Sequence, residues 1–227
     1  MVAHIRTAIV TGGSRGLGRA LVRTLANAGW TVVTDARDGV ALAEAVSGLG
    51  PAVIAVPGDL TDPHHWAELV AAAGDRIDVL VNNAGGLGPS PLPALAEYPL
   101  DQLTDLFAVN VVAQLGLIQE ALPRLASGAV IVDVTSDASV EAYAGWGGYG
   151  ATKAALDHVG RVLGVERPDL RVLTVDPGDM RTQMHQDAFP GDDISDRPPP
   201  EASVPGIIAL IEGDEPSGRY RAAEETP

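Results

Sequence analysis

The sequence predicts an α/β fold, in which one doubly wound parallel sheet of about seven strands carries helices on both faces. Short apolar runs rich in Val and Ile alternate along the chain with longer segments of helical periodicity. The runs are almost continuously apolar, which is typical of strands buried on both faces. Because successive parallel strands need a crossover, the alternation also predicts right-handed strand–helix–strand units.

The predicted elements follow one another in a regular order. The apolar runs predict strands at Thr7–Val10, Thr31–Thr34, Ala52–Val56, Asp78–Val81, Ala129–Val134 and Arg171–Val175. The periodic segments predict helices at 16–28, 39–48, 62–73, 101–126 and 149–166. Asp62 followed by Pro63 indicates a helix start, because the carboxylate caps the first turn and proline fits its first position.

The last part of the chain differs in composition. Residues 187–205 hold four aspartates and the run Pro198–Pro200, which indicates an exposed loop. One more helical pattern, Glu201–Glu212, and a short strand near Gly218–Arg221 complete the predicted fold.

Length and composition exclude several classes of protein. A chain of 227 residues fits one domain, 1–227, and its lack of cysteine excludes disulfides, thiolate metal sites and a Cys nucleophile. No His, Asp or Glu spacing indicates a metal site, and we expect His64 and His65 on the surface of a helix. The formal charge of −15 opposes nucleic-acid binding. Without a signal-peptide pattern or a membrane-length apolar run, we expect a cytoplasmic protein and no membrane partner.

A glycine-rich segment follows the first strand directly. It reads Thr11-Gly12-Gly13-Ser14-Arg15-Gly16-Leu17-Gly18. Glycines allow a tight turn and a close approach to a pyrophosphate, which the N-terminus of the next helix attracts. The segment therefore predicts nucleotide binding, with an ordinary strand–helix turn as the alternative.

The second strand ends in Thr34-Asp35-Ala36-Arg37, where this fold meets the adenosine ribose. An acid there would bond the ribose 2′-hydroxyl, whereas an arginine would neutralise a 2′-phosphate. Asp35 and Arg37 leave both alternatives open, and Arg37 could also be a solvated surface charge.

Ser136, Tyr149 and Lys153 form a candidate catalytic group. Tyr149 and Lys153 are four residues apart on a predicted helix and so share one face. A nearby ammonium lowers the pKa of a tyrosine, which would suit it for acid–base catalysis. Ser136 ends the preceding strand, from where it could bond an oxygen that gains charge. The alternative is a plain surface pair.

These motifs together resemble the classical short-chain dehydrogenase/reductase family over residues 5 to about 182. TGGSRGLG matches the family's TGxxxGxG, Asn82-Asn83-Ala84-Gly85 its NNAG and Tyr149-Gly-Ala-Thr-Lys153 its YxxxK. Asp59, Asn110, Ser136 and the segment 176–182, DPGDMRT, match further motifs in order. The resemblance implies one Rossmann-type domain, with a cofactor half at about 1–110 and a catalytic and substrate half at about 111–227.

The family's roles carry over to matching positions. Tyr149 would exchange the proton, Lys153 would lower its pKa and bind the nicotinamide ribose, Ser136 would hold the substrate oxygen and Asn110 a relay water. Arg37 after Ala36, and Arg15 in the glycine loop, are typical of members that use NADP(H), and Asp35 would point to the opposite side of the strand. The implied NADP(H) contacts are Gly12, Ser14, Arg15, Gly16, Leu17, Gly18, Arg37, Asp59, Leu60, Asn83, Ala84, Gly85, Tyr149, Lys153, Pro177, Gly178, Met180 and Thr182.

The resemblance places a substrate pocket beside Tyr149. It would be formed by Ser136, Asp137, Tyr143, Trp146, Asp179 and Met184, with Leu87–Pro93, Val140 and His185 nearby. Trp146 could instead be a buried structural residue, and the two aspartates solvated loop charges. The region Gln183–Pro200, where the family has its substrate-covering lid, is short. It could be a family variant without consequence, it could leave the pocket open, or a partner subunit could close the pocket.

The resemblance implies an NADP(H)-dependent enzyme that interconverts a small-molecule carbonyl and an alcohol. Isomerisation or elimination on the same fold, and a regulator that binds NADP without turnover, are the alternative functions. Family relatives pair helices across two-fold axes, which predicts a homotetramer, or a dimer, through helices 101–126 and 149–166. Leu103, Leu106, Phe107, Val111 and Leu115 could form such an interface or an internal core face.

Overall fold

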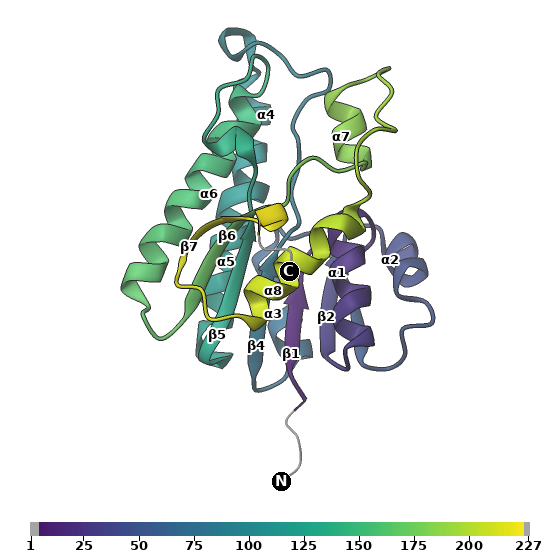
Figure 1. Cartoon of the computed structure of the whole chain (residues 1–227), viewed down its shortest axis with the longest axis vertical. Helices are drawn as coiled ribbons and strands as arrows, with labels where there is room; N and C mark the ends of the chain where they lie inside the picture. Colours follow the sequence, from purple (N-terminus) through teal and green to yellow (C-terminus); the bar gives the residue numbers. More distant parts are fainter. Residues whose placement is uncertain (1–4, 225–227) are drawn as a thin grey trace.

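A computed structural model describes residues 5–224 and confirms the predicted α/β architecture (Figure 1). Within this range, seven strands form one sheet in the order β3-β2-β1-β4-β5-β6-β7, and every neighbouring pair is parallel. The strands are β1 Thr7–Val10, β2 Thr31–Ala36, β3 Val53–Pro57, β4 Ile77–Asn82, β5 Leu125–Val134, β6 Arg171–Asp176 and β7 Gly218–Arg221. The order reverses between β1 and β4, and ligands of such sheets bind outside the carboxyl ends of the strands at that point.

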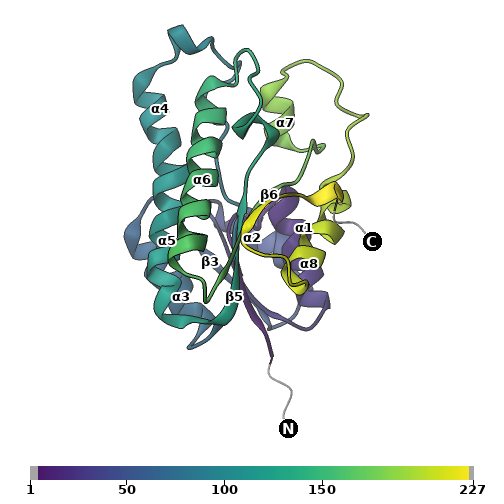
Figure 2. The same cartoon turned by 60° about the vertical axis from the view of Figure 1, so that its left-hand side comes forward.

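Helices cover both faces of the sheet (Figure 2). One face carries α1 Gly16–Asn27, α2 Gly39–Val46 and α8 Val204–Glu212. The other carries α3 Pro63–Ala73, α4 Leu100–Phe107, α5 Ala113–Ala121 and α6 Gly147–Glu166. The short α7, Gln183–Ala188, lies beyond the carboxyl edge of the strands (Figure 1).

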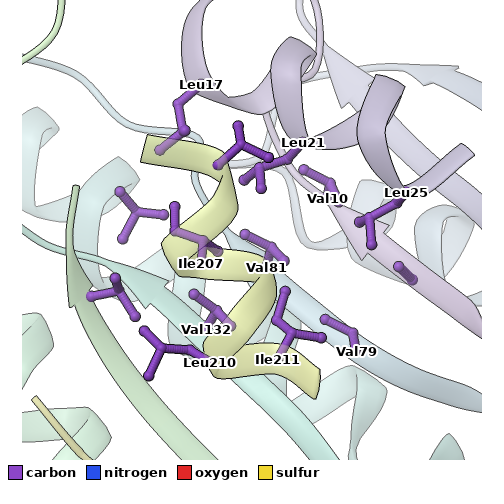
Figure 3. Packing of buried hydrophobic residues seen from close by; sticks show 14 of the residues in the cluster. Val10, Leu17, Leu21, Leu25, Val79, Val81, Val132, Ile207, Leu210 and Ile211 are labelled. Atoms are coloured by element: carbon purple, nitrogen blue, oxygen red, sulfur yellow. The ribbon is translucent and has the colours of Figure 1, made fainter. Parts of the chain in front are cut away.

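Alternation along the buried strands divides the core into two layers. On β4, Val79 and Val81 face α1 and α8, whereas Leu80 packs in the layer of α3 and α5. Figure 3 shows α8 lying across β1, β4 and β5, with Ile207, Leu210 and Ile211 among the valines of the sheet. This packing fixes the strand ends from which the functional residues extend.

The helix predicted over 101–126 is present, but it is not one regular α-helix. It divides into α4, a π-helical turn at Ala108–Val112, α5 and a 3-10 turn at Leu122–Arg124, after which β5 begins at Leu125. Proline has no N–H to donate and clashes with the preceding turn, so Pro123 accounts for the end of α5. By length and composition the run Leu100–Arg124 could cross a membrane, but it packs here as an inner helix against α3 and α6.

The loop predicted over 187–205 is partly wrong. Helix α7 extends into it as far as Ala188, and a 3-10 turn at Pro200–Ser203 precedes α8. The predicted helix Glu201–Glu212 therefore becomes α-helical only at Val204. Thr182 starts α7, because its side chain accepts a hydrogen bond from the His185 amide.

Candidate active site

A cleft of about 1620 Å³ runs along the carboxyl edge of the sheet. It is lined by the glycine loop, by the segments that follow β2 to β6, and by α7. The residues predicted for catalysis and cofactor all line this cleft except Gly18 and Asn110, and so do the six predicted to form the substrate pocket. The structure thus brings together side chains that are spread over 170 residues of sequence, from Gly12 to Met184.

The glycine loop is held close to the end of β4. Gly12 has a φ of +75°, and a Cβ on Gly18 would meet the backbone of Gly12 and the Asn83 side chain. Thr11 Oγ1 accepts hydrogen bonds from the amides of Asn83, at 3.0 Å, and Ala84, at 2.9 Å. Asn83 Nδ2 donates in turn to Thr11 O at 2.8 Å. The backbone of the loop lies so close to Asn83 that a side chain at Gly18 would collide with it, which explains the glycine at that position.

The adenosine end of the cleft presents two arginines. Arg15 and Arg37 are exposed, line the cleft, and form no ion pair with any residue in the range 5–224. Asp35 is already engaged, since Oδ1 accepts from the Gly12 amide at 2.7 Å and Oδ2 lies 3.2 Å from His65 Nε2. The surface position predicted for His65 is wrong. Its side chain is buried against Asp35 and only 3% exposed.

Asp59 lies at the end of β3, facing the cleft. Its Oδ1 accepts from the amide of Thr61 at 2.9 Å and from its hydroxyl at 2.8 Å. These two bonds hold the pKa of Asp59 below its usual value. The carboxylate is therefore an ionised acceptor fixed at the mouth of the cleft.

Ser136, Tyr149 and Lys153 meet where β5 ends. Ser136 starts the 3-10 turn Asp137–Ser139, and its hydroxyl donates to Asp137 Oδ1 at 3.0 Å. Tyr149 and Lys153 lie one turn apart on α6, with Nζ 5.7 Å from the tyrosine ring centre. Lys153 Nζ donates to Val134 O at 2.7 Å.

The electrostatics of Tyr149 differ from the sequence expectation. Burial raises the pKa of Tyr149 above its usual value of 10, as do the charges of Asp176 and Asp137, while a hydrogen bond with Ser136 lowers it. Burial dominates this shift, and the Lys153 ammonium is directed to Val134 O, so the lowering expected from Lys153 stays a prediction. Tyr149 is therefore protonated at neutral pH, as a proton donor must be.

Lys153 is buried as well, and burial lowers its pKa to about 8. The nearby charges of Asp133 and Asp157 act in the opposite direction and favour the ammonium form. At neutral pH, Lys153 thus remains mostly charged inside the protein.

Asn110 supports the wall of the site from the π-helical turn. Its Oδ1 accepts from the Gly86 amide at 2.8 Å, and its Nδ2 donates to Gly86 O at 2.9 Å and to Thr152 Oγ1 at 3.0 Å. A Cβ on Gly85 would stand 3.0 Å from Asn110 Oδ1 and 3.8 Å from Lys153 Nζ. Asn110 thus joins the segment after β4 to the helix that carries Tyr149 and Lys153.

The segment after β6 closes the cleft opposite the glycine loop. Met180 and Thr182 line it, together with Pro177 and Gly178. A Cβ on Gly16 would lie 3.6 Å from Thr182 Cγ2, so the loop and the start of α7 face each other.

The substrate end is mainly apolar, with acids at its edge. Leu87, Ala138, Tyr149 and Ala188 cluster there with Leu92, Trp146 and Met184. The Tyr143 hydroxyl donates to Asp137 Oδ2 at 3.0 Å, and Asp179 lies 3.5 Å from Arg197.

Some substrate residues were predicted wrongly or missed. Val140 is 58% exposed and does not line the cleft, and of 87–93 only Leu87 and Gly88 do so. Phe189 was missed, although its ring lies 5.9 Å from that of Trp146 and 5.0 Å from that of His185. Its spacing of four from His185 is a helical signal, which the expectation of a loop obscured.

Comparison with known proteins decides the family. A family model described as short chain dehydrogenase matches residues 6–193. The chain belongs to the short-chain dehydrogenases.

Relatives within this family cover most of the chain. The 1-deoxy-11-beta-hydroxypentalenate dehydrogenase of Streptomyces arenae is 37% identical over 199 residues, which are 81% of this chain and 70% of that protein. A short-chain dehydrogenase structure from Pseudomonas syringae has a TM-score of 0.89 and 28% identity, and covers 96% of this chain and 94% of its own. One from Shigella flexneri in complex with NADP has a TM-score of 0.87 and 29% identity, and covers 96% of each chain.

The closing strand of this short-chain dehydrogenase carries an arginine that reaches the catalytic end of the site. Arg219 on β7 donates to Ser136 O at 3.0 Å and lies 3.2 Å from Asp157 Oδ2 and 3.5 Å from Asp176 Oδ2. It therefore fixes the backbone of Ser136 and balances two buried acids beside the site.

The charge state of Lys153 can be measured directly, because it is the only lysine in the chain. Protein labelled with ¹³C at lysine Cε should give one resonance that titrates with a midpoint near 8, the pKa that burial imposes. Asp133→Asn should lower the midpoint further, since it removes a charge that favours the ammonium. The control Asp169→Asn, at an exposed site paired with Arg167, should leave it unchanged. A wild-type midpoint near 10 would contradict this assignment.

Proposed function

We propose that this short-chain dehydrogenase is an NADP(H)-dependent oxidoreductase that interconverts a small-molecule carbonyl and an alcohol. The observation that carries the proposal is the meeting of Ser136, Tyr149 and Lys153 beneath an apolar pocket, at one end of a cleft that begins at the glycine loop. The protein would act in the cytoplasm.

The cleft fits the cofactor. The backbone cradle at Gly12 and Gly18 leaves no room for side chains, as close approach to a pyrophosphate requires. The N-terminus of α1 offers amides and a partial positive charge to the phosphates. At the other end, Met180 and Thr182 would hold the nicotinamide carboxamide, and Lys153 the ribose hydroxyls. When bound, NADPH supplies the hydride.

The side chains of this chain would handle the proton and the oxygen. Tyr149, protonated in its buried position, would give its proton to the carbonyl oxygen during reduction. The Ser136 hydroxyl would donate a hydrogen bond to the same oxygen and stabilise the charge that develops there. Lys153 would stabilise the phenolate that remains, and Asn110 would hold the surrounding backbone and its relay water.

Preference for NADP(H) is supported by the two arginines. Arg37 follows β2 where the 2′-phosphate would lie, and Arg15 is close by in the glycine loop. Asp35 is the acid that could have bonded a 2′-hydroxyl, but its two carboxylate oxygens already contact the Gly12 amide and the His65 ring. The similar Shigella flexneri protein has NADP in its structure.

Arg37→Ala should raise the KM for NADPH by about 10- to 100-fold, because one charged hydrogen bond to the phosphate is lost. The KM for NADH, which has no 2′-phosphate, should change little. Steady-state kinetics with both cofactors would measure this, with Arg23→Ala as the control, an exposed arginine that does not line the cleft. A wild-type kcat/KM for NADH equal to or above that for NADPH would refute the preference.

Tyr149→Phe should lower kcat by about 10²- to 10⁴-fold, the usual contribution of a general acid, while NADPH binding persists. Lys153→Arg should lower kcat by a similar factor, because a planar guanidinium cannot replace a compact ammonium. Loss of NADPH absorbance with a panel of ketones, aldehydes and quinones would measure turnover. Tyr220→Phe is the control, since that hydroxyl donates to Pro216 O. If no carbonyl oxidises NADPH and Tyr149→Phe leaves the biological activity intact, the proposal fails.

We further propose that the protein is a homotetramer, or a dimer, through α4, α5 and α6. Leu106 is core, but Leu103, Phe107, Val111 and Leu115 are only half buried. Val112, on the same helix, and Val165, on α6, are 60% and 82% exposed. Light scattering should give four times the chain mass for the tetramer or twice for the dimer, and Val112→Glu with Val165→Glu should reduce it, because charges oppose apolar burial. A monomeric wild type would refute the assembly.

A further inference from the structure

A buried acid–histidine pair lies beneath the adenosine end of the cleft. Asp35 on β2 is 2% exposed and His65 on α3 is 3% exposed, and Oδ2 lies 3.2 Å from Nε2. Buried ionisable groups are costly unless paired, and each of these satisfies the other.

The pair touches the cofactor cradle on two sides. Through Asp35 it reaches the glycine loop, since Oδ1 accepts from the Gly12 amide at 2.7 Å and the Asp35 carbonyl accepts from the Gly13 amide at 2.9 Å. On the other side the His65 ring packs on Gly58, where any Cβ would overlap the ring atoms. Asp59, which faces the cleft, is the next residue.

We propose that His65 is a positioning residue for the adenosine half of the NADP(H) site. It holds the glycine loop in place through its bond to Asp35, and it holds the Gly58–Asp59 turn in place through the packing of its ring. This inference rests on the proposed function, because the loop is taken to bind NADP(H). His65 itself touches no cofactor, and it acts through the backbone that does.

The pair also sets the charge beneath the loop. Hydrogen bonds to Asp35 and then to Glu68 Oε2, 3.3 Å from Nδ1, raise the pKa of His65, against burial. The charged groups around it are Asp35 from β2, Glu68 from α3 and Asp59 from the turn after β3. Arg37 also lies near enough to Asp59 to act on its charge. With His65 protonated, its charge cancels that of Asp35.

Loss of that proton leaves the Asp35 carboxylate uncompensated beside a loop that binds an anion. The His65 pKa in the folded protein lies above its ordinary value of 6.5, so the balanced state is complete below 6.5. It is lost as the pH rises through the raised pKa. The affinity for NADPH should therefore fall across that interval.

Fluorescence titration of NADPH, without substrate, from pH 6 to about 9 tests the inference with three variants. His65→Leu removes both the charge and the donor to Asp35, and should weaken binding at pH 6 by about 10- to 100-fold, as for one charged hydrogen bond. His65→Gln keeps an N–H donor without the charge, so its affinity should lie between wild type and His65→Leu. His64→Leu, at the exposed neighbouring histidine, should match wild type at every pH.

The pH dependence of binding distinguishes the positioning role of His65 from a general disturbance of the fold by the substitution. The ratio of His65→Gln to wild-type Kd should be largest at low pH and approach one at high pH, where wild type has also lost the charge. Titration of the NADPH phosphate is common to all proteins and cancels in the ratio.

Each failure has its own signature. If wild type does not bind NADPH, the proposed function fails. If wild type binds and His65→Leu binds equally well, or the His65→Gln ratio is flat with pH, the positioning role is wrong. Should His65→Leu not fold, the His65→Gln ratio alone decides.

Discussion

The buried ammonium of Lys153 is the charge on which the catalytic half depends. It is 5% exposed and donates a hydrogen bond to Val134 O at 2.7 Å, while Asp133 and Asp157 favour its charged form. Those acids need partners in turn, and burial raises the pKa of Asp133 to about 6 even though Asn82 Nδ2 donates to it at 2.7 Å. Asp157 is met by Ser139 at 2.6 Å and by Arg219. Compensation of one charge thus ties β4, β5, α6 and β7 together.

The cofactor half follows the same principle with a smaller set of groups. Asp35 and His65 are paired with each other beneath the glycine loop, while Arg15 and Arg37 are exposed at the cleft. The chain has a formal charge of −15, so most of its surface repels an anion. Two arginines without an ion-pair partner among residues 5–224 make this end of the cleft an exception. The local arrangement, and not the net charge, decides what the cleft can bind.

The difference between local and long-range signals explains what the sequence could predict. The strands were confirmed because continuous Val and Ile runs are contiguous in the chain. The burial of His65 depends on Asp35, 30 residues away, and no local pattern reveals that pairing. The π-helical turn inside the helix predicted over 101–126 was not foreseen, because five residues are too few to change an apolar pattern of that length. Phe189 was missed because the composition of 187–205 predicted a loop there, although its ring contacts His185 of α7 as well as the distant Trp146.

The geometry around Lys153, the sole lysine of the chain, explains why a lysine stands there. Its Nζ lies under the Tyr149 ring, within bonding distance of Val134 O, and a Cβ on Gly85 would stand only 3.8 Å away. A guanidinium is planar and carries five donors in a fixed fork, and this enclosed position offers it one backbone acceptor. An ammonium needs less width and keeps two donors free to rotate toward the cleft. The position therefore favours lysine over arginine because of the size of the ammonium and the direction of its donors. A requirement for positive charge alone would not distinguish the two residues.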